Sequence, residues 1–188
     1  GNGLFNGNYS TGAQLGVYPS DAFSFTFTYL HSYFAAGNSD ISSSTGSYVE
    51  PDNQTPQTGQ GIAKDPFLGA PTIRDSYGIT GNWRINETFN FSAWGGYALA
   101  RAQGLDAEGN SRKGFGSDVW AWSASLSMVD IGKEGAVLSV AGGSITNSRR
   151  IDALTGDLTV PDQDTPYIIE TQYRYPLNDN ILLTPGVF

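Results

Sequence analysis

Apolar residues alternate with mostly small or polar ones along two neighbouring segments, 77–85 and 89–99. Tyr77 and Ile79, for example, stand two positions apart on one face of the first segment. A period of two is that of a β-strand. The polar connection 86–88 is short, which predicts an antiparallel hairpin. Each strand has roughly ten residues, which is about what a tilted strand needs to cross a bilayer.

Further alternating segments bring the number of predicted strands to eight. The predicted strands are 9–18, 23 to about 36, 77–85, 89–99, 119–129, 136–144, 167–175 and 181 to the end. Pro185 predicts a bulge or an edge in the last of them. The connections are short near residues 20, 87, 132 and 179, and long near 55, 110 and 155. Alternate connections of an up-and-down sheet lie at the same end. One end therefore has short turns and the other long loops, as in outer-membrane β-barrels.

The longest connection, residues 36–73, is rich in Gly, Ser, Asn, Gln and Pro and has no sustained period. Two interpretations of it remain open. The segment is either a surface loop or a loop that folds over or into the mouth of a pore.

One face of the predicted strands is apolar, with aromatic residues near both ends. We expect lipid contact at Phe25, Phe27, Ile79, Trp83, Phe91, Leu126, Leu138 and Ile169. Two interfacial girdles are expected, one of Phe23, Trp83, Phe89, Tyr173 and Tyr175 beside the short turns, and one of Tyr9, Tyr33, Tyr77, Tyr97, Trp120 and Tyr167 near the long loops. The alternative is that these side chains fill the core of a soluble sandwich.

The opposite face carries hydrogen-bonding and charged side chains. The candidates for a channel lining are Gln14, Asn82, Arg84, Asn90, Glu170, Gln172 and Arg174. If the apolar face contacts lipid, these side chains must be satisfied by water or by one another, and a wet lumen follows. If the apolar face is a core instead, they face bulk solvent. The rival functions are then a soluble all-β binding module and a membrane barrel that serves as a non-conducting anchor.

The composition excludes several other classes of protein. The 188 residues fit one domain, and no window approaches the ~18 uninterrupted apolar residues of a membrane helix. The formal net charge of −8 argues against a nucleic-acid partner, because phosphate binding needs a basic stripe. The absence of Cys removes disulfides and thiolate sites. The charge also favours cation over anion entry at a pore mouth.

Residues with catalytic or metal-binding chemistry are scarce. His31 is the only histidine, and its place beside Tyr29 and Tyr33 favours a structural or interfacial role. No nucleophile elbow or phosphate-binding loop is present. Asp152, Asp157, Asp162 and Asp164 make one loop acidic, but their spacing matches no calcium loop, which favours a solvated loop. We therefore expect no catalytic site, no metal site and no cofactor, and we expect that the protein is not an enzyme.

Several stretches resemble the OprB-type carbohydrate-selective porins, in particular their cyanobacterial branch, which is described as iron-uptake porins. The similar stretches are GLFNGNYS at 3–10, YPSDAFSFTFTYLHSY at 18–33, SYGITGNWRI at 76–85, IGKEG at 131–135 and ETQYRYPLNDNILLTPGVF at 170–188. The resemblance implies an antiparallel, up-and-down transmembrane barrel in the bacterial outer membrane. It also implies a homotrimer in lipid that passes small hydrophilic solutes, sugars and inorganic ions including iron, by passive diffusion.

The family pattern is longer than this chain. Members of this branch have an S-layer-homology domain and a coiled-coil segment ahead of a barrel of about sixteen strands, whereas residues 1–188 form a single barrel segment of about eight strands without an S-layer-homology domain. The family also continues past LTPGVF to a final strand. The resemblance therefore implies that the chain is the C-terminal half of the barrel, without its last strand. Eight strands alone would make a poor channel, because side chains fill the interior of so small a barrel.

Overall fold

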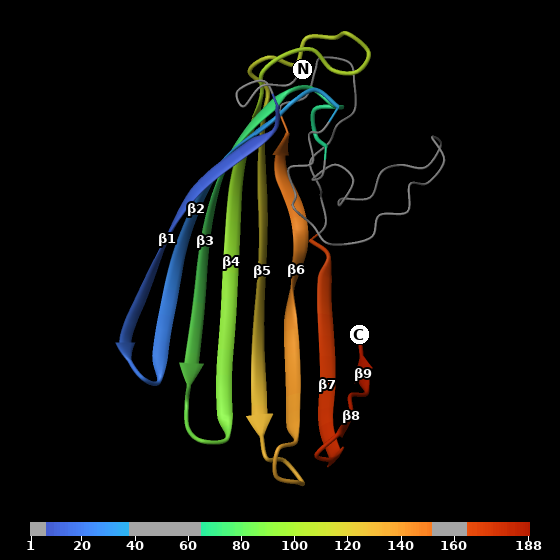
Figure 1. Ribbon diagram of the computed structural model, residues 1–188. Helices are drawn as coiled ribbons and strands as arrows, with labels where there is room; N and C mark the ends of the chain where they lie inside the picture. The colour runs from blue at the N-terminus through green and yellow to red at the C-terminus, as the bar shows by residue number, and fades with distance from the viewer. Residues whose placement is uncertain (1–6, 38–64, 152–164) are drawn as a thin grey trace.

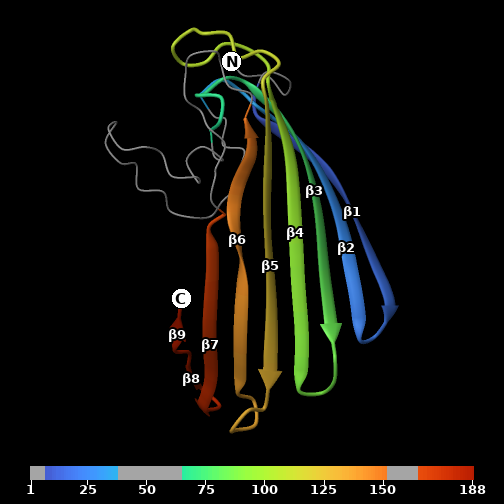
Figure 2. The ribbon, with the colours of Figure 1, turned by 180° about the vertical axis from the view of Figure 1, so that it is seen from behind.

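The computed structural model describes residues 7–37, 65–151 and 165–188, apart from the side chains of 145–151. The strands are β1 (Tyr9–Ser20), β2 (Phe23–Phe34), β3 (Thr72–Arg84), β4 (Phe89–Ala102), β5 (Gly116–Val129), β6 (Val137–Ile151), β7 (Tyr167–Asn178), β8 (Ile181–Leu183) and β9 (Gly186–Val187). They form one antiparallel sheet in the order β1 to β8, and β9 also pairs with β7. Figures 1 and 2 show this sheet as a single layer. The predicted all-β, up-and-down architecture is confirmed.

Strands β1 to β7 confirm the first seven predicted strands, and several of them are longer than expected. Strand β3 begins at Thr72 rather than at residue 77, and β4 continues to Ala102. The extra residues include Asp75 and Arg101, which occupy positions of the apolar face. Charged residues at these positions interrupt the alternation, so the pattern alone ends the strands too early.

The predicted eighth strand, from residue 181 to the end, is divided into two short strands, β8 and β9. Strand β8 pairs with the end of β7 through Tyr175 and Leu183, whereas β9 pairs further along β7 through Thr171 and Val187. Pro185 lies between the two strands. Proline has no N–H to donate to a ladder, and the expected interruption is therefore at this residue.

The short turns gather at one end of the sheet and the long connections at the other, as predicted (Figure 1). In the β3–β4 turn, the Asn86 side-chain oxygen accepts hydrogen bonds from the backbone N–H groups of Thr88 and Phe89, at 2.9 and 2.8 Å. In the β5–β6 turn, Asp130 has a φ of 62° and its carboxylate accepts a bond from the Gly135 N–H at 2.7 Å. Local side-chain bonds of this kind fix the direction of the chain at each turn.

The pairing register divides the strand residues into two faces. The apolar face is defined by rows such as Leu15, Phe27 and Ile79, and the polar face by rows such as Ser24, Asn82 and Ser92. Every residue that we expected to contact lipid lies on the apolar face. Many of its large side chains are exposed, and Ile79 is 48 % exposed. The described residues form one sheet, so they provide no second layer that would make this face the core of a sandwich.

The buried hydrophobic cluster lies at the long-loop end, on the polar face. Phe67 from the β2–β3 connection is only 1 % exposed and packs with Ala100, Ala102 and Val119 of β4 and β5. These three strand residues occupy polar-face positions. The polar face is therefore covered by loop residues at one end and open at the other. Among the described residues, no helix is long and apolar enough to span a membrane.

Candidate functional site

All seven candidate lining residues lie on the polar face, where they are distributed over several rows of paired residues. Asn82 and Glu170 belong to one row, connected through Ser92, Ser125 and Ala141. Arg84, Asn90 and Gln172 belong to the next row, connected through Ser127 and Ser139, and Arg174 follows opposite Val137. Gln14 stands apart, further toward the long-loop end, where its amide donates to the Thr28 hydroxyl at 3.0 Å. The structure thus brings six of the seven toward the short-turn half of one face.

A hollow of about 620 Å³ lies at the short-turn end of β1 to β4. Its lining includes Tyr18 and Asp21 beside the β1–β2 turn, together with Asn82, Arg84 and Asn90. The Asn82 side-chain oxygen accepts a bond from the Ser92 hydroxyl at 2.8 Å, while the Arg84 backbone N–H donates to the Ala22 carbonyl at 2.7 Å. The lining of the hollow therefore includes a cation, amides, a carboxylate and the Tyr18 ring, together with aromatic residues such as Phe23 and Trp83.

The other charged candidates lie across the sheet on β7. Arg174 borders a second hollow of about 550 Å³, which Lys133 and Glu134 of the β5–β6 turn also line. Arg84 on β3 and Gln172 on β7 are four strand spacings apart in the same row, about 19 Å along the wall. Arg84, Glu170 and Arg174 therefore do not face one another across a gap within the described residues. They lie on one wall.

Two aromatic residues of the polar face were not among the predicted site residues. Trp94 stands between Thr80 and Ser123 in the register and is 45 % exposed, and Tyr18 is 75 % exposed. The signal for Trp94 was present in the sequence, because it occupies a polar position of the alternation in 89–99. Tyr18 was harder to assign, because the register shifts between Val17 and Ser20.

The described end of the β2–β3 connection folds onto the polar face at the long-loop end. Besides the contacts of Phe67, the Leu68 carbonyl accepts a hydrogen bond from the Ala107 N–H at 3.0 Å, and the Pro71 carbonyl accepts one from the Gln103 N–H at 2.7 Å. This segment, residues 65–71, is thus fastened to the β4–β5 connection. The other residues of the same connection, 38–64, lie outside the described part of the chain.

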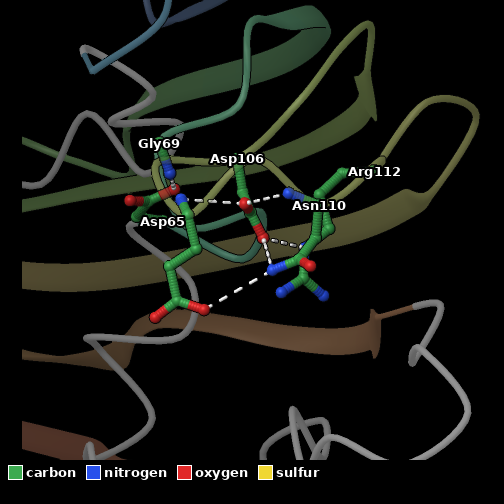
Figure 3. A network of polar contacts seen from close by, with 6 residues as sticks. Asp65, Gly69, Asp106, Asn110 and Arg112 are labelled. Atoms are coloured by element: carbon green, nitrogen blue, oxygen red, sulfur yellow. Dashed lines mark hydrogen bonds and ion pairs between the residues drawn. The ribbon is translucent and has the colours of Figure 1, made fainter.

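A polar network holds the β4–β5 connection in shape (Figure 3). The Arg112 guanidinium donates to the Asp106 carboxylate at 2.8 Å, and the two side chains are 4 % and 0 % exposed. Asp106 also accepts bonds from the backbone N–H groups of Glu108 and Asn110. Burial alone raises the pKa of Asp106, but the bonds from Asn110, Arg112 and Glu108 outweigh it and hold the pKa below its usual value. The carboxylate therefore stays ionised and paired.

His31 lies on the apolar face near the long-loop end, in a small polar cluster. Its Nδ1 is 2.9 Å from an Asp75 carboxylate oxygen, which also accepts a bond from the Tyr29 hydroxyl at 2.7 Å. The Tyr29 ring in turn packs on Tyr77 at 5.4 Å between centroids. These contacts match a structural or interfacial histidine. The described residues contain no group of three His, Asp or Glu side chains that could hold a metal ion, while Asp152, Asp157, Asp162 and Asp164 lie outside them.

The whole chain is similar to a known protein family and to cyanobacterial proteins. The family described as "Carbohydrate-selective porin, OprB family" matches residues 1–188. "Uncharacterized protein sll0772" of Synechocystis sp. is 36 % identical over 99 % of this chain and 33 % of its own length. "Uncharacterized protein alr4550" of Nostoc sp. is 28 % identical over 98 % of this chain and 28 % of its own length. This chain therefore spans about a third of the length of these relatives. No solved structure matches.

Proposed function

Because the chain belongs to the OprB family of carbohydrate-selective porins, we propose that it forms part of the wall of a water-filled channel in the bacterial outer membrane. Small hydrophilic solutes diffuse through this channel without a catalytic step. Sugars are the first class of solute, and inorganic ions including iron are the second. The full-length protein works as a homotrimer embedded in outer-membrane lipid.

The observation that carries this proposal is the contrast between the two faces of the single-layer sheet. The apolar face exposes aromatic and aliphatic side chains along strands of 12 to 15 residues in β1 to β7. Such a face is stable in contact with hydrocarbon, where backbone groups must be paired within the sheet. The polar face exposes amides, hydroxyls and charged groups, which need water. This distribution supports lipid on one side of the wall and a wet lumen on the other.

The loop contacts support the same orientation. Residues 65–71 and the β4–β5 connection cover the polar face at the long-loop end. In a barrel this is the lumen side, so the covering segments would narrow the mouth of the channel. The polar face remains open toward the short turns, where Asn82, Arg84 and Asn90 border the hollow of about 620 Å³. The candidates Gln14, Glu170, Gln172 and Arg174 complete the proposed lining.

The proposal is tested by conductance measurements on the full-length protein in planar bilayers. We expect ohmic channels whose conductance rises with salt concentration, and swelling of protein-containing liposomes in an isotonic solution of glucose. A heat-denatured preparation is the matched control. Correctly folded protein that inserts into bilayers without any conductance would favour a non-conducting anchor. Folded protein that stays in solution without detergent would favour the soluble binding module.

A further inference from the structure

The polar face carries two exposed aromatic side chains in the described strands, Tyr18 on β1 and Trp94 on β4. We propose that these two rings are stacking positions for the pyranose rings of sugars that move along the wall. The inference rests on the proposed channel function and deepens it, because it assigns the solute class to particular side chains.

Each ring lies over a glycine on the same strand. A Cβ added to Gly96 would come within 3.3 Å of the Trp94 ring, and one added to Gly16 would come within 2.9 Å of the Tyr18 side chain. The rings thus occupy the space that a Cβ would fill, close against the backbone. Covering strand glycines in this way also stabilises a sheet. Their exposure shows that a large part of each side chain still faces away from the wall.

The surroundings of the two rings are polar and can bond to hydroxyl groups. Thr80 and Ser123 stand beside Trp94 in the register, and Tyr18 shares its hollow with Asn82 and Arg84. Sites for small molecules combine an apolar or aromatic surface with a few polar groups that fix orientation. A pyranose ring has apolar C–H groups on its face and hydroxyls around its edge, so it matches this combination. An inorganic ion has no such face.

The separation of the two rings sets the size of solute that can use both. The Tyr18 ring lies over Gly16 and the Trp94 ring lies over Gly96. Gly16 shares a row of the register with Trp94, through Thr26 and Thr80, so Gly96 is three strands away from Gly16 and two residues further along β4. Three strand spacings across the sheet and two residues along the strand place the rings about 16 Å apart. A monosaccharide would contact the rings one after the other, whereas an oligosaccharide could contact both together.

The test measures sugar block of the full-length channel in planar bilayers, with glucose and maltotriose as probes. Trp94→Ala should keep the salt conductance but weaken the sugar binding constant about tenfold, the loss expected for one stacked ring. Tyr18→Ala should act in the same direction, and combining it with Trp94→Ala should cost more for maltotriose than for glucose. Trp94→Phe should stay near the wild-type value, because a flat ring remains.

The matched control is Trp122→Ala, which removes an exposed tryptophan from the apolar face. It should leave the sugar constants unchanged. Wild-type constants in Trp94→Ala and Tyr18→Ala would overturn the inference, as would equal weakening by Trp122→Ala. Channels that conduct salt but show no sugar block would overturn the inference and leave the channel function standing. A folded wild-type protein without conductance would overturn both.

Discussion

Ile79 and Thr80 are neighbours in the chain and face different surroundings. Ile79 continues a row with Phe27 on the apolar face, whereas Thr80 continues a row with Thr26 and Trp94 on the polar face. Because side chains alternate at every residue, a register shift by one position would exchange the two faces completely. The separation of apolar and polar rows is therefore a strong constraint on the pairing.

The first prediction concerns the apolar face. Ile79→Arg and Phe27→Arg should each lower the free energy of unfolding in lipid by about 2 to 4 kcal/mol, because they place a cation at the centre of the hydrocarbon layer. Urea titration of the full-length protein folded into vesicles measures this change. The matched control, Thr80→Arg on the polar face, should change stability by less than about 1 kcal/mol, because its side chain reaches water. Equal losses in all three variants would contradict the assignment of the faces.

Side-chain contacts between strands could not be predicted from the local alternation of apolar and polar residues. The alternation correctly assigned the faces of Phe27 and Ile79, because the period of a strand is a local property. The bond between His31 and Asp75 joins residues 44 positions apart, and it forms because β2 and β3 pair in one particular register. Asp75 occupies an apolar position, so polarity alone would have placed it on the wrong face.

Among the elements, the strands and the short turns were easier to predict than the long connections. The β3–β4 turn follows from a short polar segment, and Asn86 closes it through bonds to residues two and three positions ahead. The β4–β5 connection is ordered by a buried pair, Asp106 and Arg112, and by contacts with residues 65–71. Such contacts between distant loops have no period, so the sequence pattern could not indicate them.

A second prediction concerns the hydrogen-bond network around the buried Asp106 carboxylate. The pKa of Asp106 is lowered in the folded state, so its contribution to stability is complete above the ordinary value of 3.8 and is lost as pH falls through the lower folded value. Asp106→Asn should remove that contribution at neutral pH, because the amide leaves the Arg112 charge unpaired. Hydrogen exchange of residues 103–115 should then be faster than in the wild type, after correction for intrinsic rates.

The control for this experiment is Glu108→Gln, because that side chain is exposed and makes only a 3.4 Å contact with the Asn110 amide. Its exchange should match the wild type. In the wild type itself, protection of residues 103–115 should fall when the pH drops below 3.8. The same protection in Asp106→Asn as in the wild type at pH 7 would show that the ion pair does not hold the connection.

At the scale of the whole molecule, the sheet would form part of the proposed channel wall, and it is open in the described residues. Strand β1 pairs only with β2, and the other edge is formed by β7 with β8 and β9. The sequence pattern predicted the strand order and the two ends, because both follow from consecutive hairpins. Closure and total strand number depend on pairing partners, and the pattern within this chain does not specify them.

The last prediction concerns the charge of the channel. The formal net charge of −8 should enrich cations near the wall, so the full-length channel should prefer cations at low salt. Glu170 and Arg174 are exposed on the polar face of β7. Reversal potentials across a salt gradient should therefore show a weaker cation preference for Glu170→Gln and a stronger one for Arg174→Gln. Both shifts should shrink toward 1 M salt, where the Debye length is only about 3 Å.

Arg101→Gln is the matched control, because it removes an exposed charge from the apolar face, and its selectivity should equal that of the wild type. Unchanged reversal potentials in both β7 variants would remove Glu170 and Arg174 from the channel lining. A shift of equal size in Arg101→Gln would show that the total charge of the protein, rather than the charge of the polar face, sets the selectivity.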